Sequence, residues 1–169
     1  MGNTSRYLGL DLSLSSPGFA VMEVRNRQAY LLTVTHVKTN ARSWHGDRLS
    51  EIVDRLTDVF TGYGPFKVIV RERGFSAHAA TTQALFKVVG ASEMAIADIG
   101  YSGVEEIPPT SVKKTLTGDG KADKAAVAEA VKRILQLPAD FSFATDDESD
   151  ACAVVLTYLI REGLIDTKE

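Results

Sequence analysis

The sequence has 169 residues, of which 44% are hydrophobic and 24% charged, and its formal net charge is −3 at pH 7. This profile is typical of a soluble globular protein with a real core, and the length is too short for two ordinary domains. An acidic total argues mildly against nucleic acid as a partner, because proteins that bind nucleic acid usually carry a basic excess.

Residues 1–72 are predicted to form strands and one helix. The run RYLGLDL at 6–12 is β-rich and ends in polar turn residues. The runs at 18–26 and 29–39 read as the next strands of a meander. Between 43 and 62 the apolar residues recur at helical spacing, which indicates an amphipathic helix. FKVIVRE at 66–72 is another strand.

The remaining part of the chain is predicted to be mostly helical. The expected elements are an Ala-rich helix over 76–100 ended by Gly100, a strand at 104–109 stopped by prolines, a helical turn at 110–116, a polar loop at 117–124, a helix over 124–137 and a last helix over about 146–162. Antiparallel strands followed by strands that alternate with helices predict an α/β fold around a mixed sheet, in a single domain over 1–169.

Location and redox state follow from the apolar runs and the cysteine count. No apolar run approaches the ~20 residues that cross a bilayer, and the first residues lack an apolar core of signal-peptide length. We therefore expect a cytoplasmic protein that does not enter membranes. Cys152 is the only cysteine, which excludes an intrachain disulfide and a zinc cluster, and we expect it in the core.

The segment DDESDACAVVL at 146–156 places four carboxylates in five positions directly before an apolar run. Thr145 and Glu148 have the spacing of a capping box, which begins a helix at about residue 146. Acids in a first helical turn are also favoured by the helix dipole. One interpretation of the cluster is therefore a helix cap and nothing more.

Helical geometry separates these acids from one another. At about 100° per residue, Asp147 and Asp150 fall on the buried stripe of the helix, whereas Asp146 points away and Glu148 lies on the flank. Ionised groups next to a core need a counter-charge, and no basic residue stands in the first turns of this helix. A divalent cation would supply that charge.

Two strand ends offer further oxygen ligands. Asp11 ends the first strand, and Glu72 ends an apolar strand on the same face as Val68 and Val70. Each has a simpler interpretation, because Asp11 can start a turn and Glu72 can be a solvated strand end paired with the arginines beside it. A site made only of carboxylates, without a pair of histidines, fits Mg²⁺ or Mn²⁺.

Four stretches resemble one known family over nearly the whole chain. YLGLDLSLSSPGFAV holds an Asp followed seven residues later by a Gly, and VIVRERGF holds a Glu followed three residues later by an aromatic residue. VKKTLTGDGKADKAAVAEAVKRIL has the most specific pattern, with Lys, Gly-x-Gly and an acid–Lys pair, and DDESDACAVV has an Asp-x-x-Asp-Ala helix start. The sequence is similar to the RuvC-type Holliday junction resolvases of the ribonuclease H-like superfamily. Within that family it resembles a phage or prophage branch.

The resemblance implies a ribonuclease H-like fold, with a mixed five-stranded sheet flanked by helices. It implies phosphodiester hydrolysis with two Mg²⁺ ions per active site, for which Mn²⁺ can substitute. The implied metal ligands and catalytic acids are Asp11, Glu72, Asp147 and Asp150, and Lys124 joins them at the catalytic centre. The expected DNA contacts are Phe75, which would stack on bases, Lys113, Lys121, Lys124 and Arg73.

The implied partner is branched DNA, chiefly four-way junctions, in a bacterial cell or phage-infected host. Basic residues outnumber acids across 111–133, so a local surface can bind phosphates despite the acidic total; a solvated helix face is the other interpretation. Because a four-way junction has two-fold symmetry, we expect a homodimer. The candidate interface is helix 76–98 with Leu85, Val88, Val89, Met94 and Ile96, although this helix could instead only cover the sheet.

Other functions stay open from the sequence. Actin-like and sugar-kinase ATPases also begin with a strand-end Asp, but they need two such domains, which 169 residues cannot supply. A protein that binds junctions without cutting, or a broader debranching nuclease for phage replication or packaging intermediates, also fits. Leu12-Ser13 stands where many members have Pro-Gly or Pro-Ser, and Arg71 and Arg73 flank Glu72 where less charged residues are common, which leaves the cut-site preference open.

Overall fold

The structure is a computed structural model that describes residues 4–74 and 76–167. Its elements follow in the order β1 (Ser5–Asp11), β2 (Gly18–Arg25), β3 (Gln28–His36), α1 (His45–Tyr63), β4 (Val68–Glu72), α2 (Ala79–Asp98), β5 (Glu105–Ile107), α3 (Pro109–Thr117), α4 (Lys124–Ile134) and α5 (Asp146–Arg161). Each element expected from the sequence is present, in the expected order. Within the described ranges, no helix is long and apolar enough to cross a membrane.

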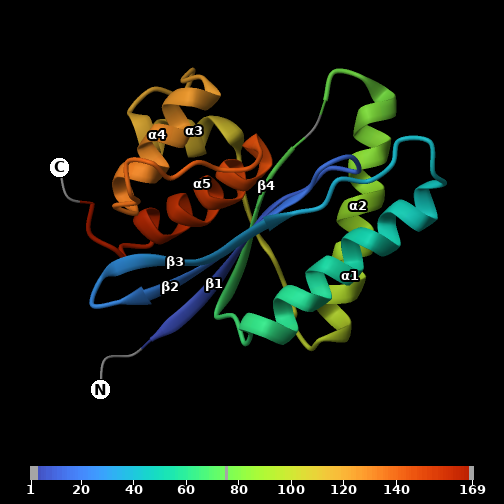
Figure 1. The fold of residues 1–169 in the computed structure, drawn as a ribbon, viewed down its shortest axis with the longest axis horizontal. Helices are drawn as coiled ribbons and strands as arrows, with labels where there is room; N and C mark the ends of the chain where they lie inside the picture. Colours follow the sequence, from blue (N-terminus) through green and yellow to red (C-terminus); the bar gives the residue numbers. More distant parts are fainter. Residues whose placement is uncertain (1–3, 75, 168–169) are drawn as a thin grey trace.

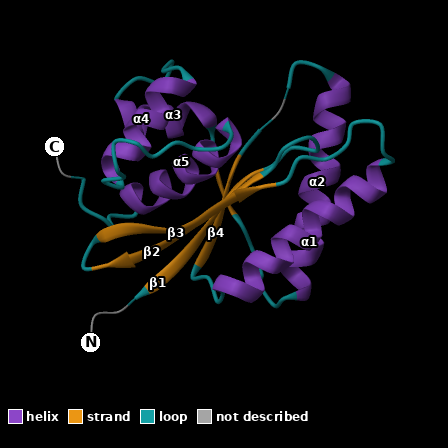
Figure 2. Ribbon diagram, in the orientation of Figure 1, coloured by secondary structure: helices purple, strands orange, loops and turns teal. Residues whose placement is uncertain are grey.

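The strands form one mixed sheet in the order β3-β2-β1-β4-β5. β1 and β3 are each antiparallel to β2, whereas β4 is parallel to both β1 and β5. Helices α3, α4 and α5 lie on one side of the sheet, and α1 and α2 lie on the other (Figure 1, Figure 2). The expected α/β fold with a mixed five-stranded sheet is confirmed.

The sheet separates two hydrophobic cores, because successive side chains of a strand point to opposite faces. In β1, Tyr7 packs in the core that contains α5, whereas Leu8 and Leu10 pack in the core beneath α1 and α2. Residues 151–157 of α5 are all buried, and they include Cys152 as expected. The sequence predicts only one buried stripe on this helix, but α5 lies between the sheet and α3 and α4, so it is buried on every side.

Three boundaries differ from the sequence prediction. α4 ends at Ile134 rather than at residue 137, and Gln136 has a left-handed φ of 53° that a helix cannot continue through. α2 begins at Ala79 rather than at residue 76. α3 is a nine-residue helix rather than a single turn, because Pro109 begins it and Gly118, with a φ of 82°, ends it.

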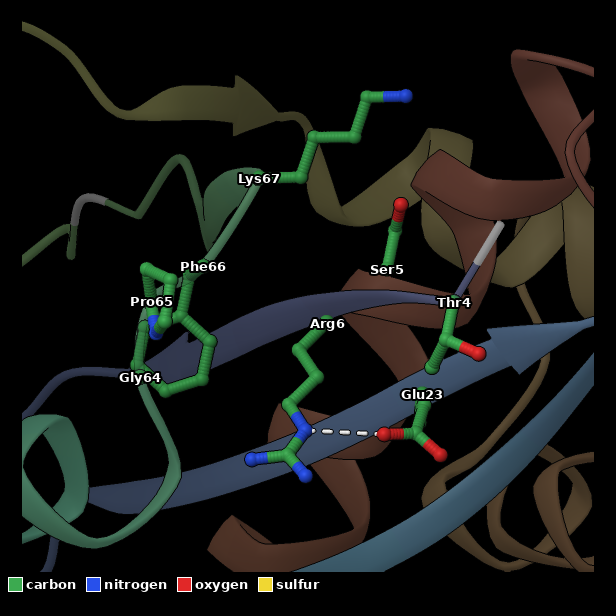
Figure 3. Close-up of a pocket in the computed structure, with 8 residues that line it drawn as sticks. All are labelled: Thr4, Ser5, Arg6, Glu23, Gly64, Pro65, Phe66 and Lys67. Carbon is green, nitrogen blue, oxygen red and sulfur yellow. Dashed lines mark hydrogen bonds and ion pairs between the residues drawn. The ribbon is translucent and has the colours of Figure 1, made fainter. Parts of the chain in front are cut away.

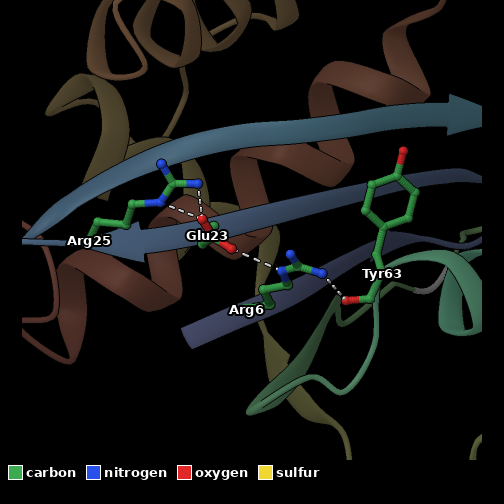
Figure 4. Close-up of polar contacts among 4 residues, drawn as sticks. All are labelled: Arg6, Glu23, Arg25 and Tyr63. Atoms are coloured by element: carbon green, nitrogen blue, oxygen red, sulfur yellow. Dashed lines mark hydrogen bonds and ion pairs between the residues drawn. The ribbon is translucent and has the colours of Figure 1, made fainter. Parts of the chain in front are cut away.

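A cluster of two arginines around the buried Glu23 lies at the amino-terminal end of β1. Glu23 is only 3% exposed, and its carboxylate accepts hydrogen bonds from Arg6, at 2.9 Å from Nε, and from Arg25 (Figure 4). The hydrogen bond from Arg6 is the main reason why the pKa of Glu23 is lowered. Arg6 also donates to the carbonyl of Tyr63 at 2.9 Å, which ties the end of α1 to the sheet. Arg6 and Glu23 line a hollow (Figure 3) at the sheet edge opposite to the carboxyl end of β1.

Candidate metal-binding active site

Asp11 and Glu72 end neighbouring parallel strands. β1 and β4 pair with Leu10 opposite Arg71, so the next residue of each strand, Asp11 or Glu72, emerges at the same edge of the sheet. Val70, two residues before Glu72, packs in the core that contains α5. Strand alternation therefore directs both carboxylates toward the face that α5 covers.

Two glycines let α5 lie directly on the sheet. A Cβ added to Gly9 would come within 2.2 Å of the carbonyl oxygen of Ala151, and one added to Gly18 would come within 2.2 Å of the carbonyl oxygen of Asp147. A residue with a side chain would push the helix away at both points. The close approach brings the first turns of α5 to the carboxyl end of β1.

α5 begins where the capping pattern predicts. Thr145 is the N-cap residue, and its hydroxyl accepts a hydrogen bond from the backbone N–H of Glu148 at 3.3 Å. The buried carboxylate of Glu148 does not return to Thr145; it accepts a hydrogen bond from the backbone N–H of Ala144 and contacts Nδ1 of His36, each at 2.8 Å. The start of α5 is thereby fixed to the end of β3.

The four acids of the expected set act on one another. The charges of Asp150, Asp147 and Glu72 act on Asp11, and the charge of Asp150 also acts on Glu72. Burial, followed by the charges of Asp150, Asp147 and Glu72, raises the pKa of Asp11 to about 8. Burial and then Asp150 raise the pKa of Glu72 to about 6. Asp146 is exposed, as the helical register predicts.

This chemistry fits a hard divalent cation. Half-buried carboxylates from two strands and one helix give an oxygen-only donor set with excess negative charge. Over residues 4–74 and 76–167, no three Asp, Glu, His or Cys side chains converge closely enough to form a ready coordination sphere. The carboxylates repel one another, which keeps their side chains apart, and a bound cation would remove that repulsion. The donor set therefore fits such an ion.

Lys124 supplies a counter-charge from a different helix. It is the first residue of α4, and its Nζ lies 3.1 Å from Oδ2 of Asp150. Burial alone would lower the pKa of Lys124, but the hydrogen bond and charge of Asp150 outweigh burial and raise it. Lys124 in turn opposes the rise in the pKa of Asp150 and of Glu72. The first turns of α5 carry no basic residue, as expected, yet part of the counter-charge comes from the protein itself.

Comparison with known proteins identifies the family. A family model described as crossover junction endodeoxyribonuclease RuvC matches residues 7–158. The chain belongs to the RuvC family. The crossover junction endodeoxyribonuclease RuvC of Prochlorococcus marinus subsp. pastoris is 33% identical over 158 residues, which cover 94% of this chain and 98% of that protein.

Solved structures agree with this assignment. Thermus thermophilus RuvC has a TM-score of 0.81 at 27% identity, covering 94% of this chain and 97% of that one. T. thermophilus RuvC in complex with a Holliday junction substrate gives the same TM-score and identity, covering 95% and 97% of the two chains. The resemblance to RuvC-type resolvases is confirmed, and RuvC proteins are metal-dependent nucleases. A phage or prophage origin stays a prediction.

The residues expected to contact DNA in this RuvC chain differ in how near they lie to the acids. Lys113 is half-buried, and its charge opposes the rise in the pKa of Glu72, so it lies beside the site. Arg73 is exposed directly after β4. Lys121 is exposed in the loop before α4, where no contact ties its side chain to the acids among the described residues. Phe75 lies outside the described residues.

Arg71 does not pair with Glu72. Its guanidinium lies on the other face of the sheet, 2.7 Å from Oε1 of Glu93 and 3.4 Å from Oε2 of Glu106. Arg71 is buried and joins β4 to α2 and β5. One interpretation from the sequence was that Glu72 is a solvated strand end paired with Arg71 and Arg73. The pairing with Arg71 is wrong.

Sequence reasoning missed two features that position the acids. Gly9 and Gly18 allow the approach of α5, a role that the sequence reasoning gave to neither, although Gly18 belongs to the family motif; a glycine inside a strand pattern, such as Gly9, is a recognised signal of close backbone approach. The contact between Glu148 and His36 joins residues 112 positions apart. No spacing rule within one element can reveal such a contact, because it depends on how β3 and α5 meet.

Proposed function

We propose that this RuvC-family protein is a metal-dependent endodeoxyribonuclease that resolves Holliday (four-way) DNA junctions in recombination or replication. The observation that carries the proposal is that β1, β4 and the first turns of α5 bring Asp11, Glu72, Asp147 and Asp150 to the same edge of the sheet in a RuvC-family chain. The likeness to T. thermophilus RuvC, which is known in complex with a Holliday junction substrate, supports the choice of DNA.

In this proposal the four acids hold two Mg²⁺ ions, with Mn²⁺ as a substitute, since oxygen-only ligation suits hard cations. When bound, such a pair supplies Lewis-acid activation of water and neutralises charge at the scissile phosphate. Asp11 is affected by the charges of Asp147, Asp150 and Glu72, so its carboxylate would help to hold the metal together with theirs. The hydrolysis then needs no serine or cysteine nucleophile, and the one cysteine is buried in the core.

Lys124 has two tasks in this proposal. Its Nζ orients the carboxylate of Asp150, and its side chain is 64% exposed, so it can also approach a DNA phosphate. Loss of Lys124 would therefore affect both metal binding and DNA placement. The other proposed DNA contacts are Phe75, Lys113, Lys121 and Arg73.

We also propose a homodimer, because cutting both strands of a two-fold symmetric junction needs two sites. Two of the apolar residues that the sequence assigns to the interface, Val88 and Ile96, are buried in the core shared with α1, so they cannot form it. The exposed apolar residues of α2 are Phe86 and Met94, which are 60% and 71% exposed. The proposed contact is this exposed face of α2, bordered by the half-buried Leu85 and Val89.

Sedimentation measures the oligomeric state directly. The wild type should have a dimer mass at micromolar concentration, and a Phe86→Glu, Met94→Glu double variant should have a monomer mass, because two charges would face each other across the contact. A monomeric wild type would overturn the dimer, and a dimeric double variant would move the interface elsewhere. Cytoplasmic location in a bacterial cell or phage-infected host stays a prediction.

Cleavage of a panel of labelled substrates tests the proposed function. Four-way, three-way, flap and duplex DNA are each incubated with Mg²⁺, with Mn²⁺ and with a chelator. We expect paired cuts in the four-way junction with either metal and none with the chelator. Binding without cutting in any metal would favour a junction-binding protein, and equal cutting of all branched forms would favour the broader debranching nuclease.

A further inference from the structure

Asp11, Gly18 and His36 lie side by side across β1, β2 and β3. Asp11 pairs with Gly18, and Gly18 pairs with His36, at the edge of the sheet where the acids gather. Residues that pair directly across antiparallel strands point to the same face, so His36, like Asp11, faces the side of the sheet that α5 covers. Strands lie ~4.8 Å apart, which places the backbone of His36 about 10 Å from that of Asp11.

The first turn of α5 lies between Asp11 and His36. Gly18, the middle residue of the row, has no side chain, and a Cβ at this position would come within 2.2 Å of the carbonyl oxygen of Asp147. The backbone of Asp147 therefore occupies the space above Gly18. A shift of this turn across the sheet would move the carboxylate of Asp147 toward or away from the carboxylate of Asp11.

Glu148 joins this turn to β3. Its Oε1 lies 2.8 Å from Nδ1 of His36, and its Oε2 accepts a hydrogen bond from the backbone N–H of Ala144 at 2.8 Å. A carboxylate accepts hydrogen bonds and does not donate them, so Nδ1 of His36 carries the proton. Glu148 is only 6% exposed, and a hydrogen bond that is shielded from water is costly to break.

Capping of α5 does not account for the position of the Glu148 side chain. The hydroxyl of Thr145 already caps the helix by accepting a hydrogen bond from the backbone N–H of Glu148. In a capping box the glutamate side chain returns to the backbone of the N-cap residue, whereas here it reaches His36 on β3. An ion pair with the first residue of α4 supports Asp150 separately. The two inward acids of α5 are thus held by different elements, Asp150 by α4 and Asp147, through its neighbour, by β3.

Building on the proposed metal-dependent cutting, we propose that His36 is a positioning residue for Asp147. Its bond to Glu148 fixes the first turn of α5 against β3, and this turn carries the carboxylate of Asp147 toward that of Asp11. Divalent cations bind oxygen ligands within a narrow range of distances, so the separation of these carboxylates controls the affinity of the site. His36 therefore sets the affinity for Mg²⁺ and does not take part in the bond-breaking step.

Calorimetric titration with Mg²⁺ and with Mn²⁺, in the absence of DNA, measures this affinity directly. His36→Ala should weaken metal binding by about tenfold or more, as the loss of a group that orients a metal ligand commonly does. In single-turnover cutting of a four-way junction, the same variant should need more Mg²⁺ for half the maximal rate and should reach the wild-type rate at saturating Mg²⁺. Partial unfolding alone would lower the amplitude of both signals without this shift in the Mg²⁺ requirement.

Three further variants connect the effect to the hydrogen bond. His36→Asn keeps an N–H donor that can reach Glu148 and should retain most of the metal affinity, whereas His36→Phe keeps a ring without the donor and should behave as His36→Ala does. Tyr30→Ala is the control, because Tyr30 is 39% exposed near the opposite end of β3, and it should behave as the wild type. The His36 side chain is 30% exposed, so its replacement leaves no cavity in the core.

A double-mutant cycle separates this proposal from the function on which it rests. His36→Ala combined with Glu148→Ala should bind metal no more weakly than Glu148→Ala alone, because the two residues act through one contact. Additive losses, or a His36→Ala variant with wild-type metal affinity, would overturn the positioning role while leaving the proposed cutting of junctions intact. A slower rate of His36→Ala at saturating Mg²⁺ would also overturn that role. A wild type that binds no divalent cation and cuts no junction would overturn the proposed function as well.

Discussion

Asp11→Asn should stabilise the metal-free protein near neutral pH. The replacement keeps the shape of the side chain and removes a charge that repels Asp150, Asp147 and Glu72. The pKa of Asp11, raised from 3.8 to about 8 by burial and then by these charges, reports how unfavourable that charge is in the folded protein. Asparagine carries no charge at any pH, so it does not experience this repulsion.

Proton linkage gives the sign and the size of the effect. Because the folded pKa of Asp11 lies above the unfolded value, its contribution to stability is full below about pH 4 and is lost as the pH rises toward about 8. Between the unfolded pKa and pH 7 lie about three pH units, each worth ~1.4 kcal/mol of folding free energy. The ionised Asp11 side chain therefore destabilises the folded protein at pH 7 by at most about 4 kcal/mol. Four acids share the repulsion and water reaches part of the cluster, so we expect about 2 kcal/mol from this one substitution.

Thermal and chemical denaturation between pH 5 and pH 8, with a chelator present, measure this effect. For a chain of this length, ~2 kcal/mol corresponds to a Tm rise of about 4–8 °C at pH 7, and the gain should shrink toward pH 5. Asp54→Asn, at an exposed position of α1, is the control and should change stability by less than about 0.5 kcal/mol. Added Mg²⁺ should stabilise the wild type more than the variant. A variant no more stable than the wild type at pH 7, or a gain that is independent of pH, would refute the reasoning.

Three other substitutions test how the fold positions the site. Gly9→Ala should lower the free energy of unfolding by about 1–3 kcal/mol and reduce cutting by the folded fraction, because its Cβ would meet the backbone of α5 at 2.2 Å. Gly62→Ala is the control, because its Cβ meets nothing within 4 Å, and it should change neither stability nor cutting. Lys124→Gln should weaken cutting and shift its pH profile upward, because the lysine opposes the raised pKa of the neighbouring acids; an unchanged profile would contradict this electrostatic role. Glu148→Ala should cost about 1–3 kcal/mol, because it removes a buried carboxylate that accepts a hydrogen bond from Ala144 and contacts His36. Cutting by the folded fraction at saturating Mg²⁺ should persist. Wild-type stability of this variant would show that these contacts do not stabilise the start of α5.

The parts of the site that lie within one element could be predicted from the sequence. A period of two along β4 puts Glu72 on the same face as Val68 and Val70, and a period of 3.6 separates the inward Asp147 from the exposed Asp146. These predictions succeed because the direction of a side chain within a regular element depends only on its position. Short antiparallel connections followed by longer crossovers likewise predict a mixed sheet, whereas the strand order β3-β2-β1-β4-β5 is known only from the structure.

The remaining features depend on how elements pack against one another. The ion pair of Lys124 with Asp150 needs the start of α4 to meet the start of α5, and no pattern in either helix reports that meeting. Burial of α5 on every side likewise depends on α3 and α4, so a stripe-based prediction underestimates it. Val88 and Ile96 show the same limit, because an apolar residue of an Ala-rich helix can face either the core or a partner.

The central claim is tested most directly by single-turnover cutting of one four-way junction at saturating protein with Mg²⁺. The variants compared are Asp146→Asn, Asp147→Asn and Asp150→Asn. Asp147 and Asp150 belong to the acid cluster at the sheet edge, so both of these variants should lose nearly all cutting while still binding the junction through the basic surface. Asp146 is exposed, and Asp146→Asn should cut at close to the wild-type rate. Mild and equal losses in all three variants would instead show that these acids only cap a helix, and would contradict a metal site at the end of this sheet.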